Sequence, residues 1–174
     1  MNRLHVYTGE GKGKSTAAMG LALRSLGHGN RVLIAQFVKD GRSGELMALK
    51  RFDNAEVLLP EPLHGFISKL SSDQKEVFQN KQTEYALMLK KRIMETNPQT
   101  IILDELGVAL SFGAVDCGAA YELIETALGS GETVVTGRFM PQRLLDKVDY
   151  ISRILPERHP YEMEKLPARK GVEW

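Results

Sequence analysis

The sequence predicts an α/β fold in which a mostly parallel sheet is covered by helices on both faces. Three observations lead to this prediction. Short apolar runs alternate with longer stretches of helical periodicity, which is the order of elements typical of such folds. Two of the runs, RVLIAQF (31–37) and TIILD (100–104), have almost no polar alternation, which indicates burial on both faces. A glycine-rich segment at 9–16 joins the first apolar run directly to the first helical stretch.

The expected strands are short apolar runs with the length of buried strands in a sheet. In chain order they are residues 4–8, 31–37, 56–59, 100–104, 133–136 and 150–154. Parallel neighbours require long crossover connections, and most of the intervening segments are long enough to hold a helix. We therefore expect these runs to form one sheet, in a single domain that spans residues 1–174.

The expected helices lie between the strands, at residues 14–28, 45–52, 73–96, 119–128 and 141–147. Gly27 and Gly29 mark the end of the first helix. The long helix has large apolar side chains at helical spacing along one face, namely Phe78, Tyr85, Leu89 and Ile93. Ser72 or Asp73 is expected to cap its N-terminus. The tail at 156–174 is rich in Pro, Glu, Lys and Arg, and we expect it to be irregular.

Composition narrows the range of functions. The chain has 174 residues, a formal net charge of +1 and one cysteine. The near-neutral charge argues against a nucleic-acid partner, and a single cysteine excludes a disulfide framework or a zinc site built from several cysteines. The N-terminus lacks the apolar core of a signal peptide, and no apolar run approaches the roughly 18 residues of a membrane span. We expect a cytoplasmic protein without a membrane partner.

The glycine-rich segment has the features of a phosphate-binding loop. It follows a strand, opens a helix, and reads Gly9-Glu10-Gly11-Lys12-Gly13-Lys14-Ser15-Thr16. Glycines allow several backbone N–H groups to approach one oxyanion, and the helix N-terminus adds partial positive charge there. Lys14 would supply a full charge for the outer phosphates of ATP, and Ser15 a hydroxyl for Mg²⁺. The sequence therefore predicts a P-loop NTPase-like (RecA-like) fold.

The loop departs from the common pattern, in which four residues separate the first glycine from Gly-Lys. Here Gly9 lies one residue closer to Gly13, and Thr8 occupies the expected glycine position. The alternative is an ordinary glycine-rich turn. Three glycines and two lysines between a strand and a helix favour the phosphate loop.

An acidic pair, Asp104-Glu105, ends the apolar run at 100–104. A carboxylate at the end of a buried parallel strand, next to a phosphate loop, is well placed to hold Mg²⁺ directly or through water. Glu105 would orient water if the protein were an ATPase. The alternative is that one of the two acids caps the following helix, where negative charge is favoured.

Three further charged residues are expected at the same edge of the sheet. Arg138 follows the strand at 133–136 in Thr136-Gly137-Arg138, and a guanidinium suits phosphate oxygens. Lys39 and Glu45 flank a glycine-bearing loop after the second strand. The alternatives are a surface arginine and a solvated loop.

Taken in order, these motifs resemble those of the P-loop class of ATP:corrinoid adenosyltransferases. The resemblance spans nearly the whole chain, and the short loop is its most specific element. The other matching segments are Gln36-Phe37-Val38-Lys39 with Gly44-Glu45, Ile102-Leu103-Asp104-Glu105-Leu106, Val135-Thr136-Gly137-Arg138, His159-Pro160-Tyr161 and Lys170-Gly171-Val172-Glu173-Trp174. The family tends to place Gly-Phe-Thr-Trp before the long helix, whereas this chain has Gly65-Phe66-Ile67-Ser68.

The resemblance implies transfer of the 5′-deoxyadenosyl group of ATP to the cobalt(I) of a reduced corrinoid, with triphosphate leaving. It implies that ATP lies reversed on the loop, that Lys14 and Arg138 stabilise charge on the departing triphosphate, and that Phe66 forms one wall of the corrinoid site. Glu105 is a further candidate catalytic residue. The resemblance also implies a homodimer and a flavoprotein reductant. Two alternatives remain at this point: an ATPase of the RecA-like class, and an ATP- or corrinoid-binding relative without transfer activity.

Overall fold

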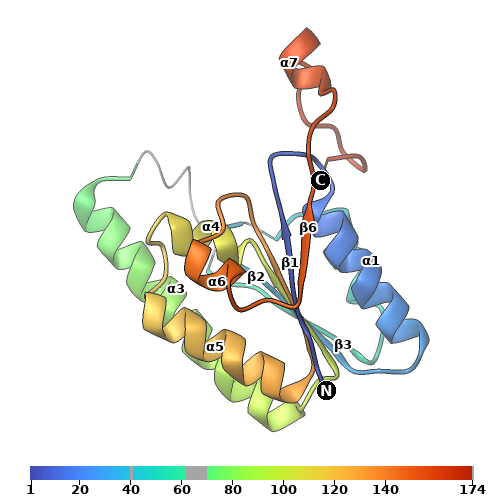
Figure 1. Cartoon of the computed structure of the whole chain (residues 1–174), viewed down its shortest axis with the longest axis vertical. Coiled ribbons are helices and arrows are strands. Elements are labelled where there is room, and N and C mark those ends of the chain that lie inside the picture. The colour runs from blue at the N-terminus through green and yellow to red at the C-terminus, as the bar shows by residue number, and fades with distance from the viewer. Residues whose placement is uncertain (40, 62–69, 174) are drawn as a thin grey trace.

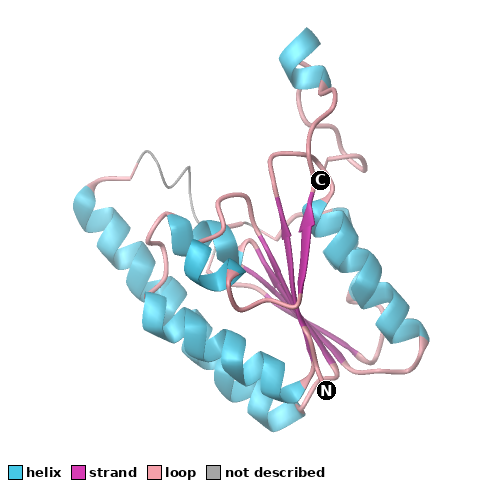
Figure 2. Cartoon of the chain, in the orientation of Figure 1, coloured by secondary structure: helices cyan, strands magenta, loops and turns pink. Residues whose placement is uncertain are grey.

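The computed structural model describes residues 1–39, 41–61 and 70–173. In this part of the chain all strand pairs are parallel and belong to one sheet of order β3-β2-β4-β5-β1-β6 (Figures 1 and 2). The strands are β1 Leu4–Thr8, β2 Val32–Gln36, β3 Ala55–Leu58, β4 Thr100–Asp104, β5 Glu132–Thr136 and β6 Tyr150–Arg153. The predicted α/β fold is confirmed, and the sheet is fully rather than mostly parallel over these residues.

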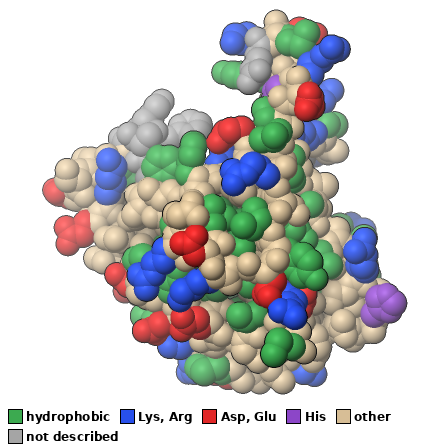
Figure 3. All heavy atoms as spheres, viewed as in Figure 1, with side chains coloured by type: hydrophobic (Ala, Val, Ile, Leu, Met, Phe, Trp, Pro, Cys, Tyr) green, Lys and Arg blue, Asp and Glu red, His purple; other side chains and the backbone are tan. Residues whose placement is uncertain are grey.

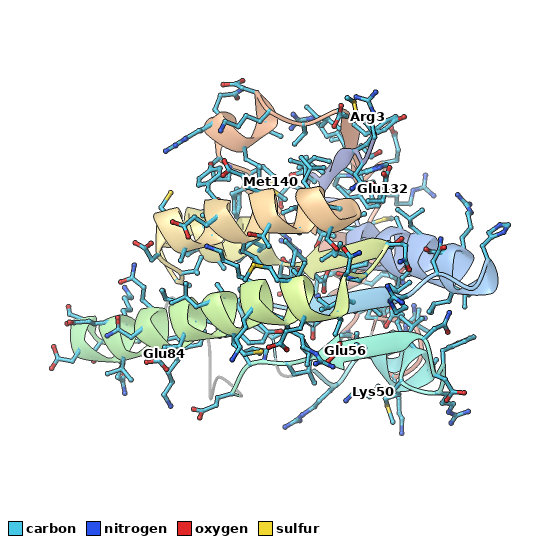
Figure 4. All side chains as sticks on the ribbon, turned by 90° about the horizontal axis from the view of Figure 1, so that it is seen from below. Arg3, Lys50, Glu56, Glu84, Glu132 and Met140 are labelled. Carbon is cyan, nitrogen blue, oxygen red and sulfur yellow. The ribbon has the colours of Figure 1, made fainter. Side chains whose placement is uncertain are left out.

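Helices cover both faces of the sheet (Figure 1). One face packs on α1 Lys14–Gly27 and α2 Gly44–Leu49. The other face packs on α3 Ser72–Thr96, α4 Leu106–Ser111, α5 Cys117–Ser130 and α6 Gln142–Leu145. Figure 4 shows α3 and α5 side by side in this second layer. A short helix, α7 Pro160–Glu164, lies in the C-terminal segment, which stands out from the rest of the molecule in Figures 1 and 3.

Strand β4 shows why its sequence lacks polar alternation. Ile101 and Leu103 are part of the core on the α3 side, whereas Ile102 is part of the core on the α1 side. All three side chains are fully buried. Because successive side chains of a strand point to opposite faces, a strand covered on both sides must be apolar throughout. The same reason places β4 in the interior of the sheet, between β2 and β5.

At the N-terminal edge of the sheet, polar contacts tie the ends of the strands together. The backbone N–H of Arg3 donates to Glu132 Oε2 at 2.9 Å, and the two residues lie close together in Figure 4. Asp149 accepts from the Arg3 guanidinium at 2.6 Å and from the backbone N–H of Leu4 at 2.9 Å. The polar residues at the opposite edge, where the strands end, form the candidate site. None of the helices in the described ranges combines the length and apolar character needed to cross a membrane.

The N-terminus of α3 differs slightly from the prediction. The cap is Ser71 rather than Ser72 or Asp73. Ser71 Oγ accepts from the backbone N–H of Gln74 at 3.3 Å, and Gln74 Oε1 accepts from the backbone N–H of Ser71 at 3.0 Å. This reciprocal pair is a capping box, in which the glutamine three residues after the cap favours Ser71 as the cap by accepting its backbone N–H. The predicted apolar face of the helix is buried, as expected, from Phe78 to Ile93.

Replacement of Ser71 by alanine is expected to lower the free energy of unfolding by about 1 kcal/mol, because it leaves a backbone N–H of the first turn without its acceptor. Urea denaturation at equilibrium would measure this loss. Ser72→Ala is a matched control, since Ser72 is exposed and lies one residue inside the helix. An equal effect of the two substitutions would contradict the assignment of the cap to Ser71.

Two short helices were not predicted. Helix α4 has six residues and begins directly after the Asp104-Glu105 pair, where the left-handed backbone of Glu105, with φ of 59°, turns the chain out of β4. The tail, expected to be irregular, contains α7, in which His159 Nδ1 accepts from the backbone N–H of Tyr161 at 3.2 Å and Pro160 occupies the first turn. Proline at the start of a helix was the signal that could have predicted α7.

Candidate active site

Four loops that follow β1, β2, β4 and β5 converge at one edge of the sheet, because the carboxyl ends of parallel strands share an edge. They carry most of the charged residues singled out in the sequence. A cavity of about 280 Å³ lies among them. Of the residues predicted for the site, those that line this cavity are Glu10, Gly11, Lys12, Gly13, Lys14, Ser15, Thr16, Lys39, Glu45, Glu105 and Arg138.

The remaining predicted residues lie beside this cavity or outside the described ranges. Asp104 is fully buried beneath the cavity and contacts Lys39 at 3.1 Å. Gly9 begins the loop that forms one wall. Phe66, predicted to contact the corrinoid, falls outside the residues that the structure describes.

The glycine-rich loop is anchored at its start by the neighbouring strands. Thr8, which occupies the position of the missing glycine, is buried, and its Oγ1 donates to the backbone oxygen of Arg138 at 2.6 Å. The backbone N–H of Ile154 donates to the oxygen of Thr8 at 2.8 Å, and the N–H of Gly11 donates to the oxygen of Ile154 at 2.9 Å. Thr8 thus ends β1 and joins the loop to the segment after β5.

Gly9 is required by this anchoring. Its φ is +101°, a value that L side chains rarely adopt, and a β-carbon built on it would collide with the backbone oxygen of Ile154. Gly9→Ala is therefore expected to reduce the free energy of unfolding by about 1–3 kcal/mol. Gly20→Ala, in α1 with open space around the position, is a matched control that should leave stability unchanged or higher. Thermal and urea unfolding of both variants test this, and equal stabilities would contradict it.

Lys14, the first residue of α1, is nearly buried, with 7% of its surface exposed. Its ammonium donates to the backbone oxygens of Gly9 and Gly11, each at 2.7 Å. Burial lowers the pKa of this ammonium, the nearby charge of Arg138 lowers it further, and Glu105 and Glu10 oppose the change. A buried cation next to backbone N–H groups at a helix N-terminus is suited to bind an oxyanion.

Asp104 lies at the centre of a hydrogen-bonded cluster. Its carboxylate accepts from Gln36 Nε2 at 2.8 Å, from Thr136 Oγ1 at 2.6 Å and from Lys39 Nζ at 3.1 Å. Burial alone would raise the pKa of Asp104, but the Lys39 charge and the hydrogen bonds from Thr136, Gln36 and Ser15 outweigh burial and lower it. Asp104 is thus held in its ionised form. It does not cap a helix, because the N-cap position of α4 is occupied by Glu105.

Glu105 extends the same cluster. Its Oε1 lies 3.3 Å from Lys39 Nζ, and its backbone N–H donates to Thr136 Oγ1 at 3.0 Å. Glu105 occupies the N-cap position of α4, but its side chain makes no capping hydrogen bond. The alternative that one of the acidic pair caps the following helix is therefore wrong for both side chains.

Arg138 and the tail complete the rim. The Arg138 guanidinium lies 3.4 Å from Glu10 Oε2, and both side chains are more than half exposed. Lys12 Nζ lies 3.3 Å from Glu173 Oε1, and Val172 and Glu173 both line the cavity. Val172 and Glu173 were not predicted as site residues, although they stand in a tail segment that carried the family resemblance.

The oxygen donors fit Mg²⁺. The Ser15 hydroxyl and the carboxylates of Asp104 and Glu105 all lie within 3.3 Å of one positive group, the Lys39 ammonium. Mg²⁺ binds through hard oxygen ligands, commonly one or two carboxylates together with phosphate oxygens and water.

A parallel sheet whose first strand enters a glycine-rich loop and then a helix defines the P-loop NTPase-like class of α/β proteins. A profile of the family described as ATP:corrinoid adenosyltransferase BtuR/CobO/CobP matches residues 1–174, and the chain belongs to this family. The resemblance found in the sequence is therefore confirmed. Membership in a family of transferases does not favour the alternative of a RecA-like ATPase.

Curated relatives agree with this assignment. The chain is 30% identical to the corrinoid adenosyltransferase of Pseudomonas aeruginosa over 173 residues, which make up 98% of this chain and 83% of that protein. It is 27% identical to corrinoid adenosyltransferase CobA of Salmonella typhimurium over 176 residues, or 97% of this chain and 84% of that protein. The corrinoid adenosyltransferase of Escherichia coli (strain K12) is 26% identical over 176 residues, with the same shares of the two chains.

Proposed function

We propose that the protein transfers the 5′-deoxyadenosyl group of ATP to the cobalt(I) of a corrinoid and releases triphosphate. The observation that carries this proposal is that two cations, the nearly buried Lys14 and Arg138, line the same cavity at the phosphate loop. The chain that holds them belongs to the adenosyltransferase family. The cations supply charge where a polyphosphate leaving group would develop it.

ATP would lie in the cavity with its polyphosphate on residues 9–16. Lys14 and Arg138 would contact phosphate oxygens, and Lys39 and Glu45 would border the nucleotide. Ser15, Asp104 and Glu105 would hold Mg²⁺, which supplies positive charge to the departing triphosphate when it is bound. Asp104 is held in a single orientation by its donors Gln36 and Thr136, so its carboxylate would meet the ion without rearrangement.

The reaction is a nucleophilic substitution at C5′ of ATP. The electron pair of cobalt(I), in the corrinoid substrate, forms the Co–C5′ bond. At the same time the C5′–O bond breaks, and the electron pair of that bond stays on the oxygen of the leaving triphosphate. No proton moves in this step, so the protein needs no general base. Its own residues orient the two substrates and stabilise negative charge on the triphosphate, which are effects of proximity and electrostatics.

The corrinoid would sit above C5′, with Phe66 as the candidate for one wall of its site. We also propose the homodimer and the flavoprotein reductant that the family resemblance implies, and the cytoplasmic location that the composition predicts. We further propose that the protein accepts cob(I)alamin, cob(I)yrinic acid a,c-diamide or both. Both cob(I)alamin and cob(I)yrinic acid a,c-diamide present the same cobalt(I) nucleophile, and they differ at the periphery of the ring.

A parallel assay of these two corrinoids tests the substrate class. Each would be reduced chemically, mixed anaerobically with MgATP and protein, and followed by its visible spectrum. Conversion of at least one into its light-sensitive adenosyl form supports the proposal, and the ratio of the two rates identifies the preferred corrinoid. Failure of both, with ATP shown to bind, would contradict it.

A further inference from the structure

The Lys39 ammonium occupies the centre of the oxygen cluster at the phosphate loop. Lys39 Nζ lies 3.1 Å from Ser15 Oγ, 3.1 Å from Asp104 Oδ2 and 3.3 Å from Glu105 Oε1. An ammonium has three donors, and here three oxygens from three different side chains surround it. These are the same side chains that we assign to Mg²⁺ in the proposed function.

The backbone before Lys39 holds it in this place. Phe37 is fully buried, and its N–H donates to the backbone oxygen of Asp104 at 2.8 Å. Val38 has φ of 48°, in the left-handed region that a β-branched residue rarely adopts. Such strain persists where surrounding contacts impose it, and it is concentrated at functional sites. The backbone that leads to Lys39 is thus positioned by β2, β4 and a strained turn, whereas a solvated loop would lack these constraints.

An ammonium and Mg²⁺ that contact the same three side chains oppose each other's binding. Mg²⁺ contacts its oxygens at about 2.0–2.1 Å, and an ammonium among the same oxygens would lie a few ångströms from the ion, where like charges repel strongly. The lysine stem is flexible and 36% of the side chain is exposed, so the ammonium has a path out of the cluster toward the cavity.

We propose that the Lys39 ammonium and Mg²⁺ compete for the oxygens of Ser15, Asp104 and Glu105. This inference rests on the proposed function, because it takes the Mg²⁺ assignment from there. Mg²⁺ enters only when Lys39 leaves, and the polyphosphate of the nucleotide provides the negative charge that draws Lys39 away. The protein therefore binds the divalent ion weakly alone and tightly with ATP, and Lys39 is a positioning residue that couples the two events.

The test compares Lys39→Met with Lys91→Met, a control that removes one positive charge from an exposed lysine on α3 whose Nζ lies 3.9 Å from Glu95. Mn²⁺ serves as the probe, and its binding is measured by electron paramagnetic resonance without nucleotide. Removal of the competing charge is expected to tighten Mn²⁺ binding at least ~10-fold in Lys39→Met. Wild type and Lys91→Met should bind equally weakly.

A second readout is thermal stability. Without divalent ions, Lys39→Met leaves two adjacent carboxylates without their cation, so its melting temperature should lie below that of the wild type. Added Mg²⁺ should raise the melting temperature of Lys39→Met more than that of the wild type. If Lys39→Met does not fold, Lys39→Gln, whose amide still donates to a carboxylate, takes its place in both measurements.

Two outcomes separate this inference from the proposed function. If wild type binds Mn²⁺ with ATP, and Asp104→Asn abolishes that binding, the Mg²⁺ assignment stands. In that case, if Lys39→Met binds Mn²⁺ without nucleotide no more tightly than wild type does, the proposed competition is wrong and the Mg²⁺ assignment is unaffected. If Asp104→Asn leaves Mn²⁺ binding with ATP unchanged, the metal assignment fails and the competition fails with it. Tighter binding in Lys39→Met that is lost in Lys39→Met/Asp104→Asn supports both.

Discussion

Replacement of Lys14 by alanine is expected to weaken ATP binding and to lower kcat/KM for adenosyl transfer by at least ~100-fold, the effect of removing one charged donor from a site that stabilises developing negative charge. The buried ammonium, together with the backbone N–H groups of the loop, would face the leaving triphosphate. Calorimetric titration with MgATP and an anaerobic transfer assay measure the two effects separately.

The same substitution has two opposing effects on the stability of the fold. Burial lowers the pKa of Lys14, so the charged form is less favourable in the folded chain than in the unfolded one. Removing the ammonium relieves this penalty but leaves the backbone oxygens of Gly9 and Gly11 without their donor, so the melting temperature should change little. Lys91→Ala is the control for an ordinary exposed lysine. Normal turnover by Lys14→Ala would refute the phosphate-loop assignment.

Asp104→Ala is expected to have the second largest effect, on stability and activity together. It removes the acceptor of Gln36 and Thr136 and the buried partner of Lys39. Removing one member of a buried ion pair costs about 3–5 kcal/mol, and the lower end applies because Lys39 is partly exposed. Transfer activity with MgATP should also be lost, since the fully buried carboxylate is a proposed metal ligand.

Chemical denaturation of Asp104→Ala and of Asp53→Ala, an exposed aspartate before β3, would measure this difference. Asp104→Asn separates the two effects, because the amide keeps the volume and part of the hydrogen bonding and loses the charge. We expect Asp104→Asn to be more stable than Asp104→Ala and equally inactive. A loss of stability in Asp104→Ala no greater than that in Asp53→Ala would contradict the role given to the cluster.

The sheet and the loop were predictable because their signals are local. Buried parallel strands are apolar throughout, as at 100–104, and a strand that runs into a glycine-rich loop and a helix is a short, continuous pattern. Helix ends were predictable only to within a residue or two, because the cap of α3 depends on a side-chain pair between Ser71 and Gln74. Helix α4 was missed because only Glu105 separates it from β4, and its largely apolar sequence LGVALS reads as a continuation of the apolar run.

The charge cluster was predictable only in part. Parallel topology implies that Lys39 and Asp104 share an edge of the sheet. Their contact depends on the pairing of β2 with β4, in which Gln36 is opposite Asp104. Strand order is set by the packing of the whole chain and has no local signal. The contact of Lys12 with Glu173 joins residues 161 positions apart, and it was beyond sequence reasoning for the same reason.

The fate of the phosphates of ATP distinguishes adenosyl transfer at the phosphate loop from hydrolysis. The protein would be mixed with MgATP and chemically reduced cob(I)alamin under strict anaerobiosis, and the corrinoid and the phosphate products would be quantified together. We expect adenosylcobalamin and inorganic triphosphate in equal amounts. ADP and phosphate, with an unaltered corrinoid, would contradict this expectation and would make the protein an ATPase.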